Sequence, residues 1–138
     1  MRLVLLACVL VLAAGCSAEG TPDVGAEELS RQAQTLVPES AEVVEISEGA
    51  CVQLDGNPAC ARIFLTSDGD EDERADELER TAEAAGWEVV RRERMGGGTA
   101  LELEREGYRA IAAVWTTPCP PGEPDEACAD EIQVIEDF

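Results

Sequence analysis

Apolar and acidic side chains alternate in the segment Thr99-Ala100-Leu101-Glu102-Leu103-Glu104-Arg105. Successive side chains of a β-strand point to opposite faces of its sheet, so Leu101 and Leu103 share one face and Glu102 and Glu104 share the other. This pattern is typical of an antiparallel sheet with one face packed against a core and one face in water. The segment therefore predicts a sheet that needs a covering layer on one side only.

The segments on either side of this strand have the same character. The glycine turn Gly96-Gly97-Gly98 precedes it and the tight turn Glu106-Gly107 follows it, as expected for short antiparallel connections. Apolar and β-branched residues predict its two partners at residues 87–92 and 108–117. The same composition predicts three more strands, at residues 42–47, 61–66 and 132–135.

A first short helix is expected to begin near Ala26. It places Leu29, Ala33 and Leu36 on one side, as the helical period requires, and Pro38 prevents its continuation. The simplest role for this apolar side is packing on the core.

A second, longer helix is expected over residues 67–86. Ser67 or Asp68 is positioned to cap it, acidic residues fill its first turn, and Gly86 is placed to end it. Trp87 follows directly and is expected in the core. The apolar stripe of this helix consists of Ala75, Leu78, Ala82 and Ala85.

These elements follow one another in the order α-β-β-α-β-β-β-β. The order predicts an α+β fold, in which an antiparallel sheet of about six strands has two helices packed on one face. We expect one domain over residues 26–138. A chain of this length buries about two thirds of the surface that it exposes when unfolded.

Residues 1–16 have a different character. A single Arg2 is followed by an unbroken apolar run over residues 3–12 and then by Ala13, Ala14 and Gly15. The run is shorter than the roughly 20 residues that a membrane-spanning helix needs, and its layout is that of an export signal. Because Cys16 comes directly after the small residues, the stretch resembles the lipobox of bacterial lipoprotein signals.

This resemblance implies that the Cys16 thiol receives a diacylglyceryl group and that cleavage leaves Cys16 as the new N-terminus. Residues 1–15 are then the signal peptide and residues 16–25 a lipid-anchored, flexible tether. The expected location is the extracytoplasmic face of a bacterial cell membrane, with the lipid bilayer as a partner. The arrangement of elements is also similar to that of small uncharacterised actinobacterial lipoproteins, a likeness that brings no activity with it.

Four cysteines lie within the expected domain: Cys51, Cys60, Cys119 and Cys128. An even number of cysteines in an exported domain predicts disulfide bonds. We expect the pairs Cys51–Cys60 and Cys119–Cys128, because both close short loops of equal length. A two-residue turn at Asp55-Gly56 also places Cys51 directly opposite Cys60. A four-cysteine zinc site is the alternative, but zinc ribbons place roughly two to four residues between paired ligands.

The charge balance argues against one class of partner. The chain has a net charge of −20, with 30 acidic residues, 10 basic residues and no histidine. Such a surface repels nucleic acid and anionic head groups, so no nucleic-acid partner is expected and a cationic partner or divalent ions are favoured. The alternative is that the acidic side chains only keep an exported domain soluble.

Catalytic patterns are missing from the sequence. Without histidine, the usual serine and cysteine triads lack their base, and the chain has no Gly-x-Ser-x-Gly segment and no phosphate-binding glycine loop. Carboxylates are abundant, so a carboxylate-dependent hydrolase is the remaining catalytic alternative. We expect no catalytic residues, no cofactor and no enzymatic activity.

One acidic pattern has the spacing of a calcium loop. Asp68, Asp70 and Asp72 alternate, and Glu79 occupies the twelfth position. Against this, the sixth position is Glu73 instead of the glycine that such loops require, and the same acids suit the start of a helix. We therefore assign no metal ligand and keep an acidic calcium-binding surface protein as the alternative. The sequence favours a non-catalytic binding or accessory module that binds or assists another component of the cell envelope, with an envelope protein as the expected kind of partner.

Overall fold

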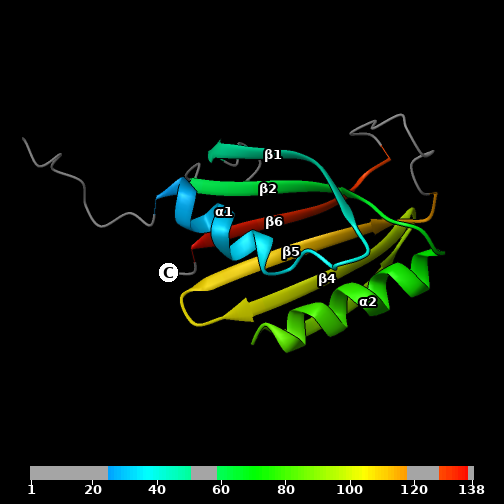
Figure 1. Ribbon diagram of the computed structural model, residues 1–138. Coiled ribbons are helices and arrows are strands. Elements are labelled where there is room, and N and C mark those ends of the chain that lie inside the picture. The colour runs from blue at the N-terminus through cyan, green and yellow to red at the C-terminus, as the bar shows by residue number, and fades with distance from the viewer. Residues whose placement is uncertain (1–24, 51–58, 118–127, 137–138) are drawn as a thin grey trace, which may run out of the picture.

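The predicted α+β fold is confirmed by the computed structural model, which describes residues 25–50, 59–117 and 128–136. One six-stranded sheet and two helices follow in the predicted order (Figure 1). The expected signal peptide, Cys16, the tether, Cys51 and Cys119 lie outside the described residues. The helices are α1 (Ala26–Gln34) and α2 (Glu71–Ala84), and the strands are β1 (Glu42–Ala50), β2 (Ala59–Thr66), β3 (Glu88–Met95), β4 (Gly98–Arg105), β5 (Tyr108–Trp115) and β6 (Asp130–Glu136).

The strands lie in the order β1-β2-β6-β5-β4-β3, and every neighbouring pair is antiparallel. Strands β3, β4 and β5 are therefore a meander, joined by the two predicted turns. The last of these strands, β6, inserts between β5, which directly precedes it, and β2, which comes much earlier in the sequence. Closing the sheet thus requires pairing between distant segments where β6 meets β2.

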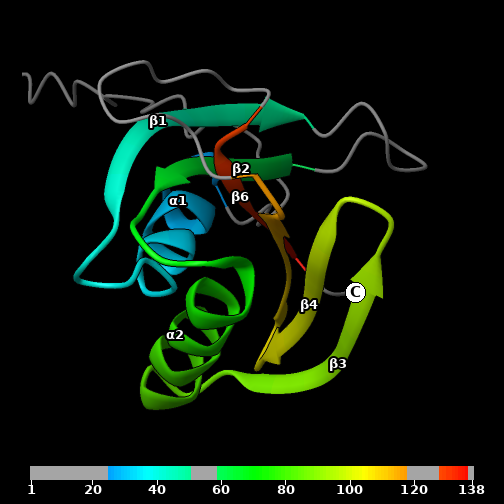
Figure 2. The same cartoon turned by 90° about the vertical axis from the view of Figure 1, so that its right-hand side faces the viewer.

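Both helices pack on the same face of the sheet (Figure 2). Helix α1 contacts β1, β2 and β6, and α2 contacts β3, β4 and β5. Leu101 and Leu103 are fully buried beneath them, as the alternation in β4 predicts. The other large, fully buried side chains are Leu29, Leu36, Ile63, Val114, Ile132 and Val134.

Helix α2 begins later than expected, because its N-cap is Asp70 and not Ser67 or Asp68. The Asp70 side chain accepts a hydrogen bond from the backbone N–H of Glu73 (2.9 Å), and the Glu73 carboxylate accepts one from the N–H of Asp70 (3.1 Å). This capping box satisfies two of the free donors at the helix start. Gly69 has a φ of 103°, so the chain turns there before it can enter the helix.

The other end of α2 is confirmed as predicted. Gly86 adopts a φ of 88°, its N–H donates to the carbonyl of Glu83, and the N–H of Trp87 donates to the carbonyl of Ala82. These two bonds make a Schellman ending, which accompanies a hydrophobic contact of the residue after the glycine. Trp87 is accordingly buried, and its indole N–H donates to the hydroxyl of Thr35 (3.0 Å), which ties α2 to the end of α1.

The hairpin between β3 and β4 predicts a specific cost for a side chain at Gly98. A Cβ atom there lies 2.0 Å from the carbonyl oxygen of Val114 on β5, so Gly98→Ala must push two paired strands apart. We expect Gly98→Ala to lower the free energy of unfolding by at least about 1–3 kcal/mol, measured by urea denaturation. The matched control is Gly96→Ala in the same turn, where the added Cβ meets nothing within 4 Å. Equal effects of the two substitutions would contradict this account.

Candidate functional site

Strands β3, β4 and β5 have one face that points away from both helices (Figure 2). We call this surface the open face. The strand registers arrange its side chains in two rows that cross the three strands. The first row is Arg91, Glu102 and Ile111, and the second is Glu93, Ala100 and Ala113.

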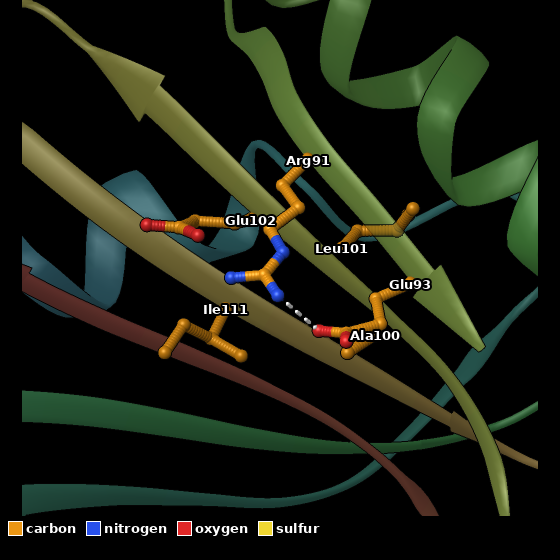
Figure 3. Close-up of a pocket in the computed structure, with 6 residues that line it drawn as sticks. All are labelled: Arg91, Glu93, Ala100, Leu101, Glu102 and Ile111. Atoms are coloured by element: carbon orange, nitrogen blue, oxygen red, sulfur yellow. Dashed lines mark ion pairs between the residues drawn. The ribbon is translucent and has the colours of Figure 1, made fainter. Parts of the chain in front are cut away.

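The open face is hollowed at its centre. The hollow has a volume of about 160 Å³ and is lined by Arg91, Glu93, Ala100, Leu101, Glu102 and Ile111 (Figure 3). Leu101 points to the core, so it contributes to the floor from the backbone side. The small side chain of Ala100 leaves the space, and the larger neighbours form the walls.

Of the three charged side chains around the hollow, two form an ion pair with each other and the third has no such partner among the described residues. The Arg91 guanidinium forms an ion pair with Glu93 (Nη2 to Oε2, 2.7 Å), and Figure 3 shows Arg91 reaching toward Glu93 with Glu102 and Ile111 nearby. Glu102 forms no ion pair or side-chain hydrogen bond with the described residues. Ile111 is 42% exposed, which is high for an isoleucine in a central strand. The hollow therefore offers one unpaired carboxylate beside one uncovered aliphatic side chain.

This lining suits binding more than bond breaking. The six residues include no hydroxyl or thiol that could act as a nucleophile. A carboxylate beside an aliphatic group is suited to recognising a positively charged side chain with an apolar neighbour. Sequence reasoning missed this site because it depends on which residues of three strands lie side by side.

A second constellation that the sequence did not reveal is buried beneath the opposite face. Arg74 on α2 and Asp130 at the start of β6 are each only 3% exposed. The Arg74 Nη1 atom donates to both carboxylate oxygens of Asp130, at 2.6 and 2.7 Å. The pair spans 56 positions of the sequence.

Arg74 also bonds two backbone carbonyls. Its Nη2 donates to the carbonyl of Trp115, the last residue of β5, and its Nε donates to the carbonyl of Gly69 (3.2 Å). The N–H of Trp115 in turn donates to Asp130 (3.1 Å). We call these four residues, Gly69, Arg74, Trp115 and Asp130, the arginine clamp. Burial raises the pKa of Asp130, and the hydrogen bonds from Arg74 and from the Trp115 N–H oppose that rise.

A third contact group joins the start of α2 to the sheet. The Glu71 carboxylate accepts hydrogen bonds from the hydroxyls of Thr99 (2.6 Å) and Thr116 (3.0 Å). The Thr99 hydroxyl contributes most to lowering the pKa of Glu71, and Thr116, Arg94 and Arg74 lower it further against the effect of burial. Glu71 thus joins α2 to the hairpin strands close to the arginine clamp.

The residues of the calcium-like spacing have separate partners. Asp70 caps α2, Asp72 forms an ion pair with Arg94 (2.8 Å), and Glu79 forms one with Arg92 (2.8 Å). Asp68 is exposed in the loop before the helix. In the part of the chain that the structure describes, no three metal-ligating side chains come together.

Two of the four expected disulfide cysteines, Cys60 and Cys128, lie within the described residues. Cys60 lies opposite Ile135, and Asp130, two residues after Cys128, lies opposite Leu65. Cys60 and Leu65 are roughly 17 Å apart along β2, so Cys60 and Cys128 are too distant to bond to each other. That removes one of the three pairings and leaves the expected one among the remaining two.

The expected position of Cys51 directly opposite Cys60 is wrong, because the residue opposite Cys60 is Gly49. The register of β1 and β2 therefore gives that pairing no direct support. Ala50, next to Cys51, does pair with Ala59, next to Cys60. The pairing Cys51–Cys60 stays a prediction, since Cys51 and residues 52–58 lie outside the described ranges.

Comparison with known proteins found no match: no family pattern fits the chain, and no curated protein or solved structure is significantly similar to it. Neither helix of the described ranges has the length and apolar character needed to cross a membrane. The assignment of a function therefore depends on the sequence and on the geometry above.

The arginine clamp predicts a large cost for removing its cation. Arg74→Met keeps the aliphatic stem but leaves the Asp130 carboxylate buried without a partner, so we expect the free energy of unfolding to fall by about 3–5 kcal/mol. The matched control is Arg94→Met, which removes the exposed ion pair with Asp72 and should cost less than about 1 kcal/mol. Asp130→Asn should lower the free energy of unfolding much less in the Arg74→Met background than in the parent chain, because the two residues act together. Additive losses in urea denaturation would argue against the clamp.

The low pKa of Glu71 predicts a dependence of stability on pH. A carboxyl whose pKa is lower in the folded than in the unfolded chain stabilises the fold above the unfolded pKa, and this contribution is lost as the pH falls through the folded pKa. We expect Glu71→Gln to be less stable than the parent chain at pH 7, and the difference to shrink as the pH falls through the lowered pKa of Glu71. The matched control is Glu83→Gln, which removes a carboxylate from an exposed position on the same helix. A difference that stays constant with pH would refute the role of Glu71.

Proposed function

We propose that this chain is a lipid-anchored, extracytoplasmic binding module of a bacterial cell envelope, without catalytic activity of its own. The anchor is supported by the export-type residues 1–15 followed by Cys16. The binding role is supported by the open face, where a hollow combines the uncovered Ile111 with the unpaired Glu102. That combination is the observation that carries the proposal.

The rest of the fold is consistent with a presenting role. Both helices and the arginine clamp lie on the covered side of the sheet, so the open face belongs to a scaffold held together from the other side. Sites built on strands of a rigid sheet hold their side chains more accurately than sites on loops. Because the hollow is built on strands of the sheet, it can bind a partner without a conformational change that closes over it.

The charge of the chain supports a protein partner over a nucleic acid. A net charge of −20 repels polyanions and attracts cationic surfaces. A tether between the lipid and the domain would hold this acidic domain away from anionic head groups, where an envelope protein can reach it.

The anchor is tested by the intact mass of the protein extracted from its native membrane. We expect the mass of residues 16–138 plus a lipid group, with a rise of about 4 Da on reduction if two disulfide bonds are present. The control is Cys16→Ser, which removes the lipidated thiol and should appear without lipid and away from the membrane. A native protein without lipid would overturn the anchor, and no mass change on reduction would overturn the disulfide bonds.

A further inference from the structure

The open face has an apolar centre with small floor residues. Ile111 is 42% exposed, and the half-buried Ala100 and Ala113 lie beside it across β4 and β5. Near the edge of the same three-stranded region, Val90 and Met95 are also 42% and 38% exposed. An aliphatic side chain of a partner placed over Ala100 would remove Ile111 from water, which is the main favourable term in such contacts.

The charge at this centre is negative after internal pairing. Arg91 is bound to Glu93, which neutralises both, while Glu102 has no partner among the described residues. Glu102 and Ile111 are directly opposite each other on β4 and β5. Side chains paired in this way have Cβ atoms roughly 5 Å apart, so a partner must present a cation and an apolar group at a similar spacing.

We propose that the open face binds a cationic peptide segment of an envelope protein, with a lysine or arginine at Glu102 and an aliphatic side chain over Ala100 and Ile111. An extended segment meets this requirement with a cationic and an apolar residue two positions apart, because such residues share a face and are roughly 6–7 Å apart. The inference deepens the proposed function, on which it rests, by naming the site and the partner chemistry.

Charge complementarity favours this occupant over two others. A second copy of the chain would place Glu102 and a net charge of −20 against the same surface, which opposes association at low salt. A divalent ion needs several oxygen ligands, and the described residues provide no group of three metal-ligating side chains. A cationic peptide satisfies the carboxylate and covers the isoleucine in one contact.

The test uses the full chain in nanodiscs of zwitterionic phosphatidylcholine, so that the probe does not bind the lipid. The probe is the peptide Lys-Ser-Ile-Ser-Lys-Ser-Ile with blocked ends, and its control replaces both lysines by glutamates. We expect the cationic peptide to shift the amide NMR signals of Ala100, Glu102 and Ile111, and the acidic peptide to leave them unchanged. Shifts confined to the helix side, or equal binding of the two peptides, would overturn the proposal.

Three variants locate the contact. Glu102→Gln should weaken binding of the cationic peptide by about two- to fivefold, as an exposed ion pair allows, and Ile111→Thr by about four- to tenfold. The matched control Glu83→Gln removes the same charge from an exposed position on α2 and should have little effect. Glu102→Lys should reverse the preference toward the acidic peptide. Equal effects of Glu102→Gln and Glu83→Gln would show that the peptide binds by non-specific charge attraction, and would overturn the proposed site.

The failure of this inference is distinguishable from the failure of the anchor. A lipidated protein that ignores the cationic peptide refutes the inference alone, and an unlipidated protein that binds it at the open face refutes the anchor alone. Sedimentation at several protein concentrations tests whether a second copy of the chain binds the open face. A dimer that dissociates when Ile111→Thr is introduced would show that it does, and would also overturn the proposal.

Discussion

The arginine clamp is the interaction on which the arrangement of α2 and the sheet depends. A buried guanidinium must use its hydrogen-bond donors within the protein, since water cannot reach them. Arg74 does so by binding the loop before α2, the last residue of β5 and the first residue of β6. One side chain therefore fixes where the helix starts and where the final strand enters the sheet. Such a pair adds little net stability over apolar packing, but few other arrangements can satisfy it.

This constraint has a consequence for the other side of the sheet. Because α2 is held over β3, β4 and β5 by contacts from the covered face, the open face takes no part in docking the helices. The alternation that buries Leu101 and Leu103 also presents Ala100 and Glu102 on the open face. The core and the candidate site are thus two faces of the same strands, and the small residue Ala100 leaves room for the hollow.

The sequence is informative wherever a structural feature is local. The alternation in β4, the apolar stripe of α2 and the Gly86–Trp87 ending all depend on neighbouring residues, and the structure confirms them. The later start of α2 at Asp70 follows from the turn at Gly69, which competes with earlier caps. The clamp was not predictable, because an arginine in an amphipathic helix suggests a solvent-exposed side chain until Asp130 is known to lie beneath it. The hollow on the open face depends on which residues of β3, β4 and β5 lie side by side. That register is known only once the strands are paired in the sheet, so the sequence alone did not predict the hollow.

The ion pairs of the arginines determine where the excess negative charge lies on the folded chain. Most arginines of the described residues are already bound to carboxylates, among them Arg62 with Glu131, Arg91 with Glu93 and Arg92 with Asp76 and Glu79. Cations that are held by their own sheet and helices cannot neutralise the rest of the surface. The unpaired acids are therefore a property of the folded chain and not only of its composition. Where such an acid lies beside an uncovered aliphatic group, as Glu102 lies beside Ile111 on the open face, long-range attraction and short-range burial favour the same kind of partner.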